Sequence, residues 1–153
     1  MTKAIEIVKL PRVHLLDVVK DLSVEQLNHI PEGFNNNIIW NLAHIVATQQ
    51  NICYKRAGLD ITIENRFFTP FIGGTKPEGF VDTGDLAIIK DLFFSTIDQL
   101  EADLQNGKFT SYSPWTTRYG NVISSAEEAV AFLPFHEGLH TGYIWALKRV
   151  ITP

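Results

Sequence analysis

The chain has 153 residues, of which 45% are hydrophobic and 20% charged, and its formal net charge is -4 at pH 7. This length suits one domain with a core of its own, and this composition excludes an intrinsically disordered chain. The acidic balance and the scattered Lys and Arg residues give no electrostatic footprint for nucleic acid, and no apolar run is long enough to span a bilayer. We therefore expect a single domain over residues 1–153 whose partners include neither nucleic acid nor a membrane.

The first expected helices lie before residue 31. Pro11 can occupy the first turn of a helix, and apolar residues at helical spacing then predict about three turns that end near Leu22. Residues 23–26 read Ser-Val-Glu-Gln, which is a capping-box pattern. This pattern predicts a short second helix that ends before Pro31.

A long helix is expected from about residue 37 to residue 57, with asparagine side chains capping its start and Gly58 ending it. One side of this helix is broadly apolar, and a polar row borders it. The polar row is either solvent surface or the lining of a polar cavity inside the domain. Its members are Asn37, Trp40, Asn41, His44, Thr48 and Asn51.

Residues 59–81 are rich in Pro and Gly and predict an irregular connection. A connection of this length is often a lid or a binding loop. Its phenylalanines indicate that it packs onto the body of the domain. Asp82 or Thr83 can then cap a third long helix to about Leu104.

Residues 109–123 predict a second irregular crossover, without a convincing pair of strands. Ser124 or Ser125 can cap the final helix, which extends to about Val150. Pro134 lies within it and predicts a kink or a new helix start just before His136, because proline has no N–H to donate. The sequence thus predicts an all-α fold with four principal helices joined by long connections.

Cys53 is the only cysteine, so no intramolecular disulfide can form. Residues 1–12 also lack the continuous apolar stretch of a signal peptide. Both observations favour the reducing cytoplasm as the location. We expect Cys53 to be a small buried core residue, because nothing near it in the sequence would lower its pKa.

Two histidines of the last helix, His136 and His140, are four residues apart and therefore lie one turn apart on the same face. With Glu137 they match the H-E-x-x-H letters of zinc metalloproteases. The thirteen residues that follow His140 contain no His, Asp, Glu or Cys, so the downstream third ligand of such proteases is missing. A third ligand must come from upstream, and His44 is the obvious donor. His14 and His29 are weaker candidates.

Three short sequence motifs of this chain occur together in one known family. They are Leu-Ser-x-Glu-Gln-Leu at residues 22–27, Trp-Asn-Leu-Ala-His at residues 40–44, and the histidine pair followed by Gly142 and Ile144. With them the chain resembles the DinB-like (damage-inducible B) superfamily. The resemblance implies an antiparallel four-helix bundle with long crossover connections. It also implies a homodimer and a divalent metal, zinc or nickel, held by His44, His136 and His140.

The resemblance also bears on function, because some relatives are thiol-dependent transferases or isomerases and many have no known activity. Thr141 and Gly142 stand where commoner versions carry another histidine and a basic residue, so no particular thiol or substrate carries over. Three neutral histidines leave open positions on a metal, which is typical of catalytic metal sites. We therefore expect a metal-dependent enzyme that acts on a small molecule by thiol transfer or hydrolysis.

Two alternatives remain open at this point. The first is a non-catalytic metal- or ligand-binding helical dimer, and the second is a purely structural bundle whose histidines are core residues.

Three further residues are candidates for the site. Glu137 is rotated by about 100° around the helix from His136. It is the candidate catalytic residue, as a general base, or it instead forms a hydrogen bond to a neighbouring helix. Asn41 and Tyr143, each about one turn from a proposed ligand, can line the pocket. The alternatives are solvent exposure for Asn41 and core packing for Tyr143.

Overall fold

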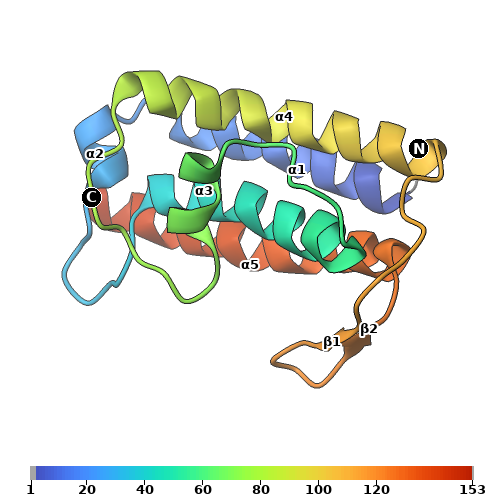
Figure 1. The fold of residues 1–153 in the computed structure, drawn as a ribbon. Helices are drawn as coiled ribbons and strands as arrows, with labels where there is room; N and C mark the ends of the chain where they lie inside the picture. Colours follow the sequence, from blue (N-terminus) through green and yellow to red (C-terminus); the bar gives the residue numbers. More distant parts are fainter. Residues whose placement is uncertain (1–2, 153) are drawn as a thin grey trace.

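Four long helices lie side by side in the computed structural model, which describes residues 3–152 (Figure 1). They are α1 (Lys3–Val19), α3 (Ile38–Gln49), α4 (Thr83–Gln105) and α5 (Ala126–Ile151), and the short α2 (Val24–Asn28) precedes α3. Helices α1 and α5 run in one direction, and α3 and α4 run in the other (Figure 1). The predicted all-α bundle with long connections is confirmed. Between residues 3 and 152 no helix is both long and apolar enough to cross a bilayer.

Side-chain caps set the helix starts where the sequence places them. Ser23 forms the complete capping box of α2, and Asn37 caps α3 by accepting a hydrogen bond from the backbone N–H of Trp40 at 2.8 Å. Asp82 caps α4 and Ser125 caps α5 in the same way. Each cap satisfies a backbone N–H that has no partner within its helix.

The first helix begins earlier than the sequence predicts. Helix α1 starts at Lys3 and continues through Pro11, which was expected in its first turn. Pro11 lies on the exposed face of α1, whereas Ile5 and Val8 on the opposite face are buried. Burial of apolar residues in these first turns outweighs the one backbone hydrogen bond that proline removes.

Helix α5 continues through Pro134, so of the two expected effects of this proline a new helix start before His136 is wrong, and a kink stays a prediction. Two more local features differ from the prediction. Beyond Gln49 the chain of α3 continues as a π-helical turn, η1 (Gln50–Tyr54), and a 3-10 turn, η2 (Lys55–Ala57), before Gly58 ends it with a φ of 73°. A small antiparallel hairpin, β1 (Trp115–Thr116) and β2 (Val122–Ile123), forms where no strand pair was expected.

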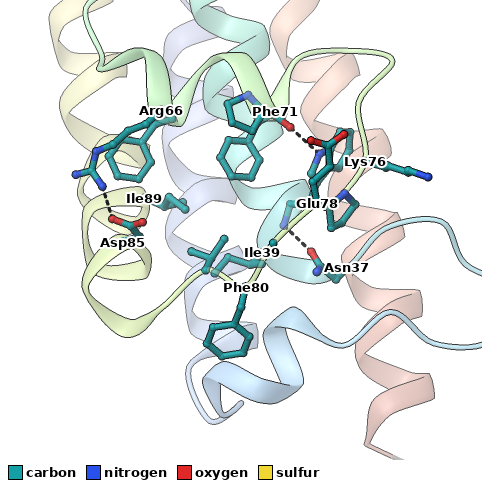
Figure 2. A pocket seen from close by; sticks show the side chains of 15 residues that line it. Asn37, Ile39, Arg66, Phe71, Lys76, Glu78, Phe80, Asp85 and Ile89 are labelled. Atoms are coloured by element: carbon teal, nitrogen blue, oxygen red, sulfur yellow. Dashed lines mark hydrogen bonds and ion pairs between the residues drawn. The ribbon is translucent and has the colours of Figure 1, made fainter.

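The connection from Gly58 to Asp82 packs onto the bundle, as its phenylalanines predict. It contains two 3-10 turns, η3 (Asn65–Phe67) and η4 (Thr69–Phe71). Phe67, Phe68 and Phe71 are buried, but Phe80 is 62% exposed. Together with α3 and α4 this connection encloses a cavity of about 350 Å³ (Figure 2).

A layer of polar residues, one from each long helix, crosses the core. Arg12 of α1 donates hydrogen bonds to both carboxylate oxygens of Glu137 of α5, at 2.7 and 3.0 Å, and one to Oε1 of Gln49 of α3 at 2.9 Å. Nε2 of Gln49 donates to the backbone carbonyl of Thr96 of α4 at 2.9 Å. The layer separates two apolar clusters, one with Leu15, Ile45, Phe93 and Ile144 and the other with Val8, Ile52, Ile97 and Leu133.

Replacement of Arg12 by Met should destabilise the fold by about 3–5 kcal/mol, because the Glu137 carboxylate then remains buried without its partner. Arg12 is 1% exposed and Glu137 is 4% exposed, so water cannot replace the lost contacts. The double variant Arg12→Met/Glu137→Leu should recover most of the loss. Urea denaturation of the three proteins measures both effects. A loss below about 1 kcal/mol for Arg12→Met, the range of an exposed ion pair, would contradict this account.

Candidate metal centre

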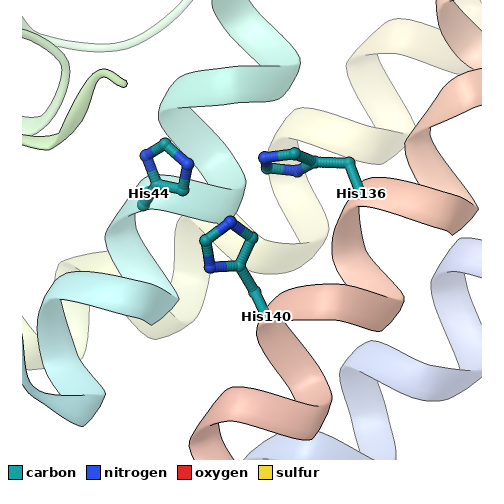
Figure 3. Close-up of side chains that lie close together, drawn as sticks. All are labelled: His44, His136 and His140. Carbon is teal, nitrogen blue, oxygen red and sulfur yellow. The ribbon is translucent and has the colours of Figure 1, made fainter. Parts of the chain in front are cut away.

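Three histidines from two helices converge at one place in the bundle. His44 comes from α3, and His136 and His140 come from successive turns of α5 (Figure 3). Each ring offers one nitrogen, and these nitrogens lie within 4.8 Å of one another. The ring centroids are 4.5 to 5.2 Å apart. The structure therefore brings together the three histidines that the sequence singles out, and their spacing allows them to hold a metal ion.

The ring of His44 is fixed by its surroundings. Its Nδ1 lies 2.6 Å from the backbone carbonyl oxygen of Phe71, and a carbonyl can only accept a hydrogen bond. Nδ1 therefore carries the proton and Nε2 keeps a free lone pair, which has only a 3.3 Å contact with the hydroxyl of Thr48. The indole of Trp40 stacks on the same imidazole with 4.6 Å between centroids and 10° between planes.

The ring of His140 is oriented by Asn41, which is buried rather than exposed to solvent. The amide nitrogen of Asn41 donates to the side-chain oxygen of Asn36 at 2.9 Å and to the backbone carbonyl of Asn37 at 2.7 Å. Its amide oxygen is thereby turned to His140, and Nδ1 of His140 donates to it at 2.8 Å. Nε2 of His140 is then the unprotonated nitrogen, available as a ligand.

His136 has a buried nitrogen without a hydrogen-bond partner. Among the described residues, two buried side-chain nitrogen or oxygen atoms have no hydrogen-bond partner. They are Nδ1 of His136 and Nε2 of Gln50. Buried polar atoms are nearly always paired, because desolvation without a new partner is unfavourable. An unpaired imidazole next to two others is the feature expected where a metal ion satisfies the rings together.

The three rings are neutral at physiological pH. Burial lowers the pKa of His136 to about 3 and that of His140 to about 4; the repulsion that a second charged ring would meet, and the cation of Arg118, act in the same direction. Burial also lowers the pKa of His44, against the opposing effect of its hydrogen bond to the Phe71 carbonyl. Neutral imidazole is the form that binds a metal.

This donor set fits a divalent transition metal. Neutral imidazole nitrogens suit zinc and nickel among other ions, at about 2.0–2.1 Å for zinc. Two nitrogens on one tetrahedral zinc ion thus lie about 3.3–3.4 Å apart. The three nitrogens lie within 4.8 Å of one another, so a shift of roughly 1 Å by each ring brings them to that spacing.

Glu137 points away from the histidine cluster and toward α1. Both of its carboxylate oxygens accept hydrogen bonds from Arg12, and the cluster that could hold a metal consists of the three histidines alone among residues 3–152. This position supports the structural alternative raised for Glu137. A role as general base stays a prediction.

The remaining sequence candidates lie outside the histidine cluster. Tyr143 is 36% exposed and contacts the ring of Phe34, so it is not a core residue. His14 and His29 are exposed.

A cavity of about 380 Å³ opens onto the histidines, and part of its wall comes from residues that the sequence did not single out. The turn of the hairpin contributes Arg118, and α5 contributes Phe132. The only local signal was the concentration of aromatic residues in 109–123. Most of the polar row lines this cavity, as expected for one of its two interpretations: Trp40, His44, Thr48 and Asn51 face this space, whereas Asn37 and Asn41 do not.

Fold and site together define a class of protein, a helical bundle with three neutral histidines gathered from two of its helices. The chain belongs to the DinB superfamily, since the model of that family matches residues 11–144. The match includes all three histidines. Comparison with curated proteins gives no match.

The metal-free protein should lose stability as the pH falls from about 6.5 toward 4. In that range the unfolded chain protonates its histidines, whereas His136 and His140 stay neutral in the fold, so the unfolded state binds more protons. The contribution of these two histidines to the free energy of unfolding has its full value above about pH 6.5 and decreases below it.

Urea denaturation in the presence of a chelator, at half-unit steps of pH, measures this effect. The variant His136→Gln/His140→Gln should show a shallower decline, because the carboxylates common to both proteins titrate alike. Identical slopes for the two proteins would contradict the prediction.

Proposed function

We propose that this protein binds a divalent metal, zinc or nickel, through His44, His136 and His140, and acts as a metal-dependent enzyme on a small molecule by thiol transfer or hydrolysis. The observation that carries the proposal is the convergence of three neutral imidazoles at the wall of a cavity. Hydrogen bonds leave Nε2 of His44 and of His140 as their ligand atoms. Three protein ligands leave room for a further molecule on the ion.

A divalent ion at this place supplies Lewis acidity, which lowers the pKa of a thiol or a water molecule that enters the site. The protein contributes position and surroundings. Asn41 and the Phe71 carbonyl hold two of the rings in one tautomer. Trp40 covers one face of His44 and so excludes water from it. Such outer partners support both the orientation and the basicity of histidine ligands.

The untagged protein, purified without a nickel column, should contain about one divalent metal ion per chain by elemental analysis. His44→Ala should lower the metal affinity by more than the roughly 10–100-fold that follows loss of an outer hydrogen-bond partner. His14→Ala is the matched control, because His14 is exposed and lies outside the cluster. Absence of stoichiometric metal, with His44→Ala affecting only stability, would favour the purely structural bundle.

Turnover separates an enzyme from a non-catalytic metal- or ligand-binding module. The zinc- or nickel-loaded protein should hydrolyse an activated ester such as p-nitrophenyl acetate, or join a small thiol to an aryl halide such as 1-chloro-2,4-dinitrobenzene with loss of chloride. His136→Ala should abolish this activity, and His29→Ala should retain it, because His29 is exposed and lies outside the cluster. Metal binding without turnover across a broad panel of esters and electrophiles would leave the non-catalytic module as the better account.

We also propose that the protein is a cytoplasmic homodimer. Exposed apolar residues of α1 and α5, among them Leu10 and Trp145, line a groove between these helices. Gly138 and Gly142 lie in the same groove, and a Cβ added at either would meet no atom within 4 Å. Exposed apolar patches of this kind support protein contacts. A monomeric mass by light scattering of the native protein at micromolar concentration would contradict the dimer.

A further inference from the structure

The cavity over the histidines has an unusual charge balance. Arg118 is the only lining residue with a formal charge at neutral pH, and among the described residues of the wall none is Asp or Glu. A divalent metal on three neutral histidines adds further positive charge. The rest of the wall is uncharged: it has aromatic rings such as Trp40, Trp115 and Phe132, neutral amides and hydroxyls such as Asn51 and Thr117, and some aliphatic residues and glycines.

The backbone of Arg118 is held in place by the hairpin. The turn that contains it is closed by hydrogen bonds from Thr117 N–H to the Asn121 carbonyl at 2.8 Å and from Gly120 N–H to the Thr117 carbonyl at 3.0 Å. Gly120 has a φ of 89°, a conformation that other residues rarely adopt. Arg118 thus lies in a hydrogen-bonded turn rather than in an open loop.

Aromatic contacts dock this hairpin onto α5 on both sides of Arg118. The ring of Trp115 meets the edge of Phe132 at 5.9 Å between centroids, and the ring of Tyr119 meets Phe135 at 5.2 Å. Edge-to-face pairs of this kind add to the stability that burial alone supplies. They place the turn beside the helix that carries two of the histidines.

The guanidinium of Arg118 has no carboxylate partner among residues 3–152. Other arginines are engaged, since Arg12 pairs with Glu137 and Arg66 pairs with Glu64 and Asp85. A planar guanidinium binds carboxylate, sulfonate or phosphate oxygens through two parallel hydrogen bonds. In a cavity lined by one sign of charge, attraction for such an anion is strengthened.

We propose that this cavity binds a small organic anion whose carboxylate, sulfonate or phosphate group pairs with Arg118, while its apolar body lies against the aromatic wall beside the histidines. The inference deepens the function proposed above and rests on it for the reaction, but binding of the anion at Arg118 does not require the metal. It assigns the class of substrate: an anion, with its reacting group reaching the histidine cluster. A cavity of about 380 Å³ suits a ligand of small-metabolite size.

The cavity between the 59–81 connection, α3 and α4 provides a contrast. It lies under the connection from Gly58 to Asp82 and also contains an arginine, but Arg66 is turned onto Asp85 there (Figure 2). Glu78 and Lys76 line the same cavity, so charges of both signs are present. Trp40 lines both of these cavities, and of the two the one that contains the histidines offers a cation without a carboxylate beside it.

The experiment compares ligands of nearly equal shape and different charge on the full-length protein. Benzoate, benzenesulfonate and phenyl phosphate are the anionic probes, and benzamide and benzylamine are the neutral and cationic controls. Binding is measured by nuclear magnetic resonance titration of zinc-loaded and of chelator-treated protein. The variants are Arg118→Gln, Arg118→Lys and the matched control Arg149→Gln, which removes the same charge from an exposed arginine outside this cavity.

At least one anionic probe should bind about tenfold more tightly than benzamide, because a charge-assisted hydrogen bond is added. Arg118→Gln should remove this preference, Arg118→Lys should keep part of it, and Arg149→Gln should leave it unchanged. The preference for anions should persist in the chelator-treated protein. Loss of metal binding would therefore test the proposed metal site, and loss of the preference would test the anion site. Equal binding of anions and benzamide, or equal losses in Arg118→Gln and Arg149→Gln, would overturn the inference.

Discussion

The pairing of Arg12 with Glu137 is the interaction on which the arrangement of the helices depends. A buried ion pair adds little net stability over apolar residues of the same size, but it is satisfied in only one relative rotation of the helices that carry it. Glu137 lies between His136 and His140 along α5, so turning its carboxylate to α1 turns both imidazoles to α3. Gln49 accepts a hydrogen bond from the same arginine and so fixes the rotation of α3. His44 lies just over one turn earlier on this helix. One buried contact thus determines which side of two helices faces the cavity.

Stability and metal binding are opposed in such a site. Three neutral rings are packed together, and one keeps a buried nitrogen without a partner, which is unfavourable in the metal-free protein. The same feature prepares the site for a cation, since no proton has to be displaced and two tautomers are already set by Asn41 and the Phe71 carbonyl. The surrounding apolar packing stabilises an arrangement that the rings alone would not adopt. This is a common relation between a functional site and its scaffold.

Much of this arrangement could be predicted from local sequence. Helix starts depend on caps, and Ser23, Asn37 and Asp82 carry the side chains that a cap requires. The histidine pair of α5 depends on helical periodicity alone. The partner of Glu137 is 125 residues away, and Arg118 reaches the cavity through a hairpin with only two residues in each strand, so no local pattern reveals either. Pro11 was misplaced because burial of Ile5 and Val8 outweighs proline's local preference.

The placement of Glu137 also bears on chemistry. In zinc metalloproteases the glutamate of the same letter pattern serves as general base. Here both oxygens of the glutamate are bound to Arg12, and the described wall of the cavity contains no carboxylate. A reaction at this site therefore suits a nucleophile that gives up its proton to solvent. A thiol has an ordinary pKa of about 8.5 and water one of about 15.7, and a metal ion held by the histidines would lower either toward neutrality. In either proposed reaction, activation of the nucleophile would therefore rest on the metal ion rather than on a carboxylate of the described wall.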